Sequence, residues 1–218
     1  MSPLTRRPTK DELRQRIMTT ADELCRTLGF SKMTVADIAA ELGISPAYVY
    51  KFFSSKQSII EACADQRLAE KKACVLASLR PHSTVLDQIA SILKSIHHVH
   101  KERFKNEGHI YKLVLTAYTE KWACTRYFRE FLLKLMTDLV EEGIRKKEFQ
   151  PADPLDTARI LLDSFAWITH PLLYRELEET GTEERIRTQL RFLEKGLSPS
   201  LPPKSDEISK NSLLFKAR

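Results

Sequence analysis

Residues 34–56 read TVADIAAELGISPAYVYKFFSSK, and the spacing of their apolar, glycine and capping residues is the most informative feature of the chain. Apolar side chains recur at helical intervals up to Gly43, which predicts a short helix ending at a left-handed glycine. A single residue separates this glycine from Ser45 and Pro46, an N-cap residue followed by a first-turn proline. The small Ala39, four residues before the glycine, lets two helices approach closely. The stretch therefore predicts a helix-turn-helix.

Helices are also expected on both sides of this motif. An apolar stripe predicts a helix over residues 10–28, ended by a glycine. Thr34 and Asp37 resemble a capping box at the start of the first motif helix, and the second motif helix should extend from residue 47 to about 52. Ser54 is expected to open a long helix that reaches residue 79.

Beyond Pro81 the apolar pattern predicts a larger body that is helical almost throughout. Expected helices begin near residue 84 and cover residues 109–118, 124–147, 154–174 and 182–195, with the six glycines as helix terminators. Pro171 should disturb the fourth of these helices, because proline removes a backbone hydrogen bond and clashes with the carbonyl of Trp167. The sequence thus predicts an all-α chain with a head over 1–56 (its basic arm over 1–9), a body over 57–196 and a flexible tail over 197–218.

Composition excludes several other classes of protein. The chain has 218 residues, of which 35 are Lys or Arg and 29 are Asp or Glu, and only six are glycine, which argues against a turn-rich all-β fold. Its longest uncharged stretch, residues 164–174, is too short to cross a bilayer, and the N-terminus lacks the apolar core of a signal peptide. The four cysteines show no CxxC spacing, and we interpret them as reduced core thiols of a cytoplasmic protein.

The second motif helix should turn a polar face outward, with Val49 and Phe53 facing the core. The residues left for solvent or a partner are Ser45, Ala47, Tyr48, Tyr50 and Lys51. Hydroxyls, tyrosines and a lysine suit contacts to phosphates and to base edges in a DNA major groove. Free amides at two helix N-termini, with Lys56 beside one of them, would favour phosphates as well. A plain corner between two helices is the alternative interpretation of the spacing.

Residues 34–56 resemble the signature of the TetR (tetracycline repressor) family of transcriptional regulators, most specifically in Tyr50, Phe53 and Lys56 and the apolar pair that follows. The resemblance spans about residues 10–62 and implies a homodimer that places the third helix of each head in a major groove. By position it implies base-edge or nearby contacts for Ser45, Ala47, Tyr48 and Lys51, and phosphate contacts for Thr34, Tyr50 and Lys56.

Two features of the head leave its DNA contacts open. Many family members have a polar residue or lysine where this chain has Pro46, so no base preference follows from the resemblance. The N-terminal arm, with Arg6, Arg7 and Lys10, either reaches phosphates or the minor groove, or is a solvated terminus.

The resemblance also implies that the C-terminal helices bind a small molecule and join two subunits. Large apolar side chains with a few polar groups could line a pocket for a largely apolar ligand, or simply form the core: Tyr111, Tyr118, Trp122, Phe128, Phe131, Met136, Phe165 and Trp167. The last two helices could form a four-helix dimer interface, or pack within the chain, through Leu161, Phe165, Ile168, Leu172, Ile186, Leu190 and Leu193.

The leading hypothesis is a homodimeric repressor that binds double-stranded operator DNA and is released by a small molecule. We expect no enzymatic activity, because the sequence holds none of the common nucleotide-binding or hydrolase motifs. We also expect no cofactor, no metal and no membrane partner. The alternatives are a helical metal-binding protein or enzyme that uses His97 and His100, which share a helix face, and a protein-interaction module.

Overall fold

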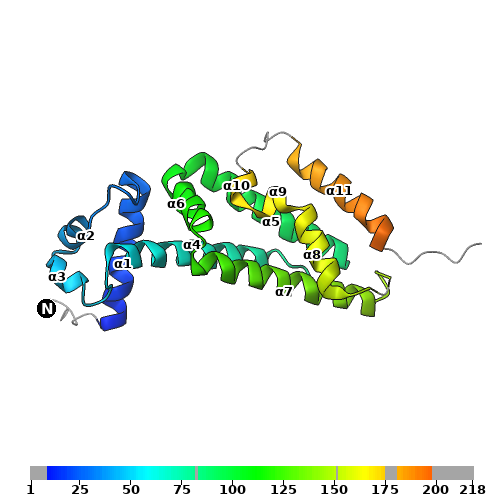
Figure 1. Ribbon diagram of the computed structural model, residues 1–218, viewed down its shortest axis with the longest axis horizontal. Coiled ribbons are helices and arrows are strands. Elements are labelled where there is room, and N and C mark those ends of the chain that lie inside the picture. The colour runs from blue at the N-terminus through cyan, green and yellow to red at the C-terminus, as the bar shows by residue number, and fades with distance from the viewer. Residues whose placement is uncertain (1–8, 82, 151, 175–180, 198–218) are drawn as a thin grey trace, which may run out of the picture.

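A computed structural model of the protein describes residues 9–81, 83–150, 152–174 and 181–197. Within these ranges the chain is helical and contains no strand, so the predicted all-α fold is confirmed. A small helical head lies at one end, and the long helix α4 (Lys56–Ala77) runs from it into a larger helical body (Figure 1). The predicted arm up to residue 8 and the predicted tail from residue 198 lie outside the described residues.

The head consists of α1 (Lys10–Leu28), α2 (Val35–Leu42) and α3 (Pro46–Val49). The predicted capping box of α2 is present: the Thr34 hydroxyl accepts from the amide of Asp37 at 3.1 Å, and the Asp37 carboxylate accepts from the Thr34 amide at 2.8 Å. Gly43 ends α2 in the left-handed conformation with a φ of 64°. Buried Ala39 allows α2 to pack closely on its neighbours.

Two helix ends in the head differ from the sequence-based prediction. Helix α3 ends at Val49, and residues 50–52 form a turn rather than its last helical residues. The N-cap of α4 is Ser55 instead of Ser54, because the Ser55 hydroxyl accepts from the amide of Ser58 at 3.0 Å. Both serines have a side chain that can cap a helix, so the conformation of the chain between α3 and α4 determines which of them is the N-cap.

The body contains α5 (Val85–Asn106), α6 (Gly108–Thr119), α7 (Ala123–Arg145), α8 (Pro154–Ser164), α9 (Ala166–Thr169), α10 (Pro171–Tyr174) and α11 (Thr182–Leu197). Helix α4 packs on α5 and α7, α7 packs on α8, and α11 packs on α5 (Figure 1). The core runs continuously from the head into the body, since buried side chains of α1, α4 and α5 belong to one apolar cluster. None of the helices in the described ranges combines the length and apolar character that crossing a membrane requires.

The helix expected over 154–174 is divided into α8, α9 and α10. The disturbance predicted at Pro171 is present, but a second break at Phe165 was not predicted. There the Gln189 side chain donates to the carbonyl of Ser164 at 2.5 Å, while the amide of Ile168 donates to the carbonyl of Phe165 at 2.9 Å. A contact from α11 thus replaces the helical hydrogen bond that would have continued α8.

The expectation that every glycine ends a helix is wrong for Gly108, Gly143 and Gly196. Gly108 begins α6, while Gly143 and Gly196 lie inside α7 and α11. Gly143 is needed for space, because a Cβ atom there would collide with the ring of Phe149. The interpretation of the cysteines also needs one correction: Cys74 is exposed, while the other three are buried.

Candidate DNA interface and ligand cavity

The outer face of α3 and the turn after it carry the side chains predicted to meet DNA. Ser45, Ala47, Tyr50 and Lys51 are exposed, with half of the Tyr50 surface open to solvent. Tyr48 is half-buried, since its ring packs edge-on against Phe52 with 5.6 Å between the ring centroids. The Lys51 ammonium lies 5.2 Å from the Tyr48 ring centroid. The motif therefore presents one aromatic and basic surface with a fixed shape.

Two of the predicted contact residues also cap helices. The hydroxyl of Ser45 accepts from the amide of Tyr48 at 3.2 Å, and that of Thr34 accepts from Asp37 at the start of α2. A capping hydroxyl uses its oxygen as an acceptor, so its own hydrogen remains available to a phosphate oxygen. Both side chains can thus fix a helix end and donate to DNA at once.

Lys56 lies in the first turn of α4, next to the loop between α1 and α2. Its ammonium donates to the carbonyl of Ser31 at 3.0 Å, which leaves two further donors on the same nitrogen. The positive charge is thereby held at the N-terminus of α4, where the helix dipole also favours an anion. The sequence predicts Lys56 at the start of this helix, as the structure shows, but not its bond to Ser31, which is 25 residues away.

Ion pairs connect the head to the body through α1. Arg26 bonds to Asp22 at 3.0 Å and pairs with Glu107, the residue that precedes α6. Asp22 also pairs with the buried Arg67 of α4 at 2.5 Å. Helix α1 is thus tied both to α4 and to the junction of α5 with α6.

The same chain of charges continues inside the body. Glu70 pairs with Arg67 at 2.8 Å and with Arg103 of α5 at 3.5 Å, and Arg103 donates to the carbonyl of Arg67 at 2.8 Å. The sequence does not predict this network, because its members come from α1, α4, α5 and the residue between α5 and α6. No pattern of local spacing marks such pairs.

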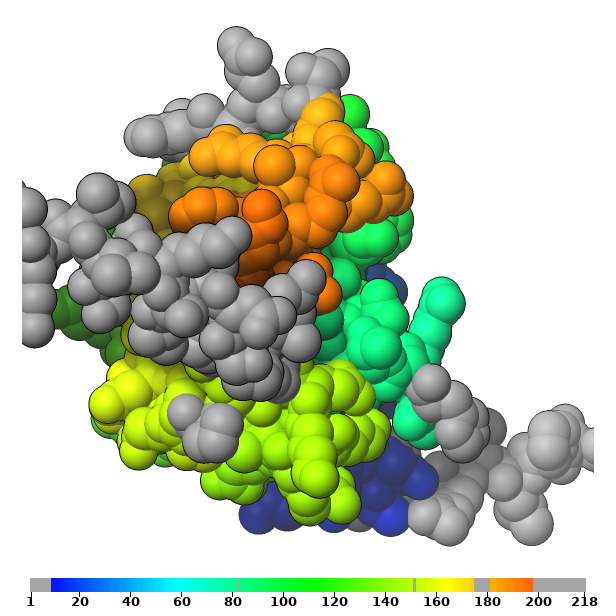
Figure 2. Space-filling view, turned by 90° about the vertical axis from the view of Figure 1, so that its right-hand side faces the viewer, coloured from blue at the N-terminus to red at the C-terminus, as the bar shows by residue number. Residues whose placement is uncertain are grey.

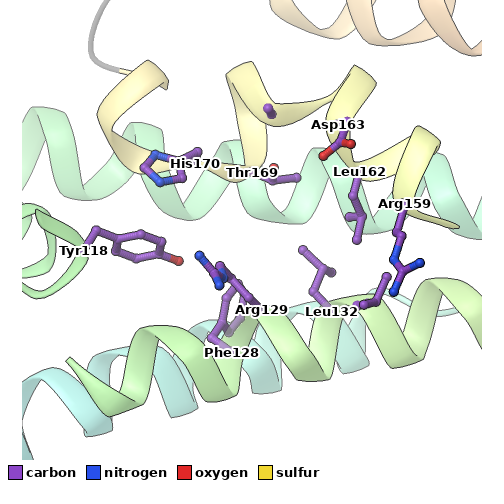
Figure 3. A pocket seen from close by; sticks show the side chains of 11 residues that line it. Tyr118, Phe128, Arg129, Leu132, Arg159, Leu162, Asp163, Thr169 and His170 are labelled. Atoms are coloured by element: carbon purple, nitrogen blue, oxygen red, sulfur yellow. The ribbon is translucent and has the colours of Figure 1, made fainter. Parts of the chain in front are cut away.

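A cavity of about 310 Å³ lies between α7 on one side and α8 and α9 on the other (Figure 3). Its lining residues are Tyr118, Phe128, Arg129, Leu132, Leu133, Arg159, Leu162, Asp163, Ala166, Thr169 and His170. The volume falls within the range of about 300–1,000 Å³ that is usual for small-molecule sites. Its walls combine leucine and phenylalanine side chains with a few polar groups.

Of the residues predicted to line a ligand pocket, Tyr118 and Phe128 do so. Tyr111 is buried and donates to the carbonyl of Pro171 at 2.7 Å, while Trp167 donates to the side chain of Gln189 at 3.1 Å. Trp122 donates to Glu120 at 2.8 Å on the surface. The remaining three, Phe131, Met136 and Phe165, pack in or against the core. The sequence does not predict the polar lining residues. A charged residue on a helix is expected on a solvent-exposed face as well as in a pocket, so the sequence alone does not distinguish the two.

A buried cluster of bases lies behind Phe128. Lys71 is 1% exposed, and its amine lies 2.7 Å from the Nε2 atom of His100 and 4.5 Å from the Phe128 ring centroid. Burial lowers the pKa of Lys71 and that of His100 well below their usual ranges, and the nearby Arg103 lowers both further. Burial therefore favours the neutral form of both side chains.

The histidines considered as metal ligands belong to this cluster. His97 is hydrogen-bonded to the hydroxyl of Tyr174 at 3.1 Å, and His100 to Lys71. Among the residues that the structure describes, no three His, Cys, Asp or Glu side chains converge on a point that could hold a metal ion.

Most side chains predicted to form a dimer interface are covered by their own chain. Leu161, Phe165, Ile168, Ile186 and Leu190 are buried, and Leu193 is half-buried. The seam between α11 and the helices beneath it is thus filled within one subunit, and these side chains have almost no surface left for a second copy. Leu172 is 39% exposed.

Other apolar side chains of the same helices do face solvent. Ile160 of α8 is 61% exposed and Phe192 of α11 is 76% exposed. Figure 2 looks onto the end of the body, where α11 (orange) forms part of the outer surface.

Comparison with known proteins agrees with this arrangement of head and body. Residues 17–63 match the family described as bacterial regulatory proteins of the tetR family, and residues 86–188 match the tetracyclin repressor-like C-terminal domain. The HTH-type transcriptional regulator YfiR of Bacillus subtilis is 26% identical over 204 residues, which cover 88% of this chain and 96% of that protein. The nucleoid occlusion factor SlmA of Haemophilus influenzae is 29% identical over 96 residues, 44% of either chain.

Solved structures share the fold at low sequence identity. A TetR-family regulator from Pectobacterium atrosepticum superposes with a TM-score of 0.63 at 19% identity, covering 89% of this chain and 100% of its own. A TetR/AcrR-family regulator from Thermobifida fusca gives a TM-score of 0.62 at 22% identity, covering 84% of this chain and 97% of its own.

Proposed function

Because the chain belongs to the TetR family of DNA-binding transcriptional regulators, we propose that it is a repressor that leaves its operator when a small molecule binds. The effector site in this proposal is the cavity between α7 and the pair α8 and α9. The protein acts in the cytoplasm and catalyses no reaction.

The observation that carries the DNA-binding part is the exposed aromatic and basic face of α3 and its following turn. In this proposal Ser45, Ala47, Tyr48 and Lys51 meet base edges or lie close to them, while Thr34, Tyr50 and Lys56 hold phosphates. The capping hydroxyls and the anchored Lys56 support these roles, because groups that are already fixed lose little freedom on binding.

Regulators of this family bind operator DNA as dimers. We propose that this chain forms a two-fold dimer through exposed apolar side chains of α8, α10 and α11, among them Ile160, Leu172 and Phe192. A two-fold dimer presents two α3 helices to two half-sites, which lie about 34–36 Å apart or at a multiple of one helical turn.

Release requires that the ligand bind more tightly to the arrangement that cannot hold DNA. Helix α4 carries the buried Lys71 beside Phe128 of the cavity and reaches the DNA face at Lys56. Ion pairs also connect α1 to α4 and to the start of α6. A change in the cavity that tilts α4 would therefore alter the separation of the two α3 helices.

The test begins with selection of bound fragments from the source genome or a random DNA pool by the full-length protein. Affinity for the selected operator is then measured over a range of salt concentrations. If each dimer neutralises about eight phosphates, log K should fall with log[salt] with a slope of about −7. Failure to select any sequence, together with no DNA affinity at about 50 mM salt, would contradict the proposal.

A further inference from the structure

We propose that the cavity binds an amphipathic carboxylate, with its anionic head beside Arg129, Tyr118 and His170 and its apolar body along Phe128 and Leu132. This inference rests on the proposed function, since it takes the cavity as the effector site. It adds the chemical class of the ligand and the residues that select for it.

Polar groups converge at one end of the cavity. In Figure 3 the hydroxyl of Tyr118 and the guanidinium of Arg129 point toward each other, with the ring of His170 above them. The rings of Tyr118 and His170 are in edge-to-face contact, with 5.1 Å between the centroids. These side chains come from α6, α7 and the residue between α9 and α10, so the fold itself brings them together.

The polar groups at this end lack hydrogen-bond partners within the part of the chain that the structure describes. Arg129 makes no hydrogen bond or ion pair there, and the Nδ1 atom of His170 is buried without a partner. Burial raises the pKa of Tyr118, so its phenol stays protonated and can donate. A carboxylate has two oxygens that accept from such groups, and guanidinium binds it in a bidentate manner.

The charges around this end also favour an anion. Burial is the main cause that lowers the pKa of His170, and Lys71 and Arg129 lower it further. Arg103 is already neutralised by Glu70. Arg129 is thus a cationic group at this end of the cavity that has no carboxylate partner in the described part of the chain.

The opposite end of the cavity has a different character. There Arg159 is already paired with Asp156 at 2.9 Å, and the lining carboxylate of Asp163 adds a negative charge (Figure 3). An anionic head therefore belongs at the Arg129 end.

Apolar side chains form the walls between the two ends. Leu132, Leu133, Leu162 and Ala166 lie along the cavity, and the ring of Phe128 closes one side. The volume of about 310 Å³ lies at the lower end of the range of about 300–1,000 Å³ for small-molecule sites, which suits a short straight-chain acid. We use octanoate as the probe.

Calorimetry on the full-length protein without DNA tests the ligand class with octanoate, 1-octanol and octylamine. Octanoate should bind at least tenfold more tightly than 1-octanol, and octylamine should not bind. Arg129→Gln should weaken octanoate at least tenfold and leave 1-octanol unchanged. The matched control is Arg126→Gln on the same helix, because Arg126 is exposed, lies outside the cavity and pairs with Glu130 at 3.8 Å. It should change octanoate affinity less than twofold.

Equal affinity for octanoate and 1-octanol would overturn the proposal, as would the absence of octanoate binding or an equal loss in the Arg126 variant. Operator DNA is then added in a separate experiment. If octanoate binds but does not release the operator, the result supports the carboxylate site and contradicts only the proposed release mechanism. If the DNA selection finds no operator, the proposed function is contradicted. The calorimetry still tests the ligand class, because it is done without DNA.

Discussion

Tyr48 is half-buried on the α3 face, where its ring packs against Phe52 and lies near the Lys51 ammonium. A fixed aromatic side chain suits base readout, because it loses little conformational freedom when DNA binds. Its hydroxyl can donate to a base edge, and its ring can contact a thymine methyl group.

We therefore expect Tyr48→Ala to weaken operator binding by about 10- to 100-fold, in line with about 1–3 kcal/mol for a good base contact. Binding to scrambled DNA should fall much less. Tyr48→Phe keeps the packing on Phe52 and separates the role of the hydroxyl from that of the ring. Fluorescence anisotropy with both DNAs measures the effect, and equal losses on the two DNAs would remove Tyr48 from base readout.

Lys56 should contribute affinity without sequence preference, because its ammonium is fixed on the Ser31 carbonyl at the N-terminus of α4. Lys56→Gln is expected to weaken operator and scrambled DNA alike. It should also reduce the salt slope by about 0.9 per lost phosphate contact, or about 1.8 per dimer. Lys134→Gln, on an exposed pair with Asp138 of α7, is the control. An unchanged slope in the Lys56 variant would contradict its contact with a phosphate.

Among the elements, α1 and α4 depend on each other through Asp22 and Arg67. Asp22→Asn should destabilise the protein by about 3–5 kcal/mol, because it leaves the guanidinium of Arg67 buried with less compensating charge. Glu70 still pairs with Arg67, so the lower end of that range is expected. Urea denaturation measures the change in the free energy of unfolding.

Asp138→Asn is the matched control for this measurement. It removes the same kind of charge from the exposed pair with Lys134, where a surface ion pair contributes at most about 1 kcal/mol. If the two variants lose equal stability, the buried pair does not join the helices in the way proposed here.

On the scale of the whole molecule, charge is distributed unequally between head and body. Residues 1–56 contain nine basic and six acidic residues, whereas residues 57–195 contain 22 basic and 21 acidic residues. The nearly neutral body contains the cavity, whereas each head has an excess of basic residues close to the proposed DNA face. The excess is modest, so a dimer with two heads is needed to raise the electrostatic contribution to binding.

The dimer itself should depend on exposed apolar residues of α8 and α11. Phe192→Glu is expected to shift the protein toward monomer in analytical ultracentrifugation, because it places a charge in an apolar interface. Operator affinity should fall with it, since one head contacts only one half-site. Leu76→Glu, at an exposed apolar residue of α4, should leave the dimer intact. A Phe192→Glu protein that remains fully dimeric would exclude this face.

Local sequence patterns were sufficient to predict the helix-turn-helix and most helix ends, because these features depend on side chains within about four residues of one another. The capping box of Thr34 and Asp37 and the left-handed Gly43 are such local features. The resemblance to the TetR family rests on the same stretch, residues 34–56.

Packing between distant helices determines which side chains line the cavity, which charges connect the helices and which apolar residues remain exposed. Tyr118 and His170 meet across 52 positions of sequence, and Arg26 meets Glu107 across 81. Leu190 and Phe192 are both large apolar residues of α11, yet the first is buried and the second is exposed. These outcomes depend on how separate helices pack against each other, and contacts between distant segments leave no periodic trace in the sequence.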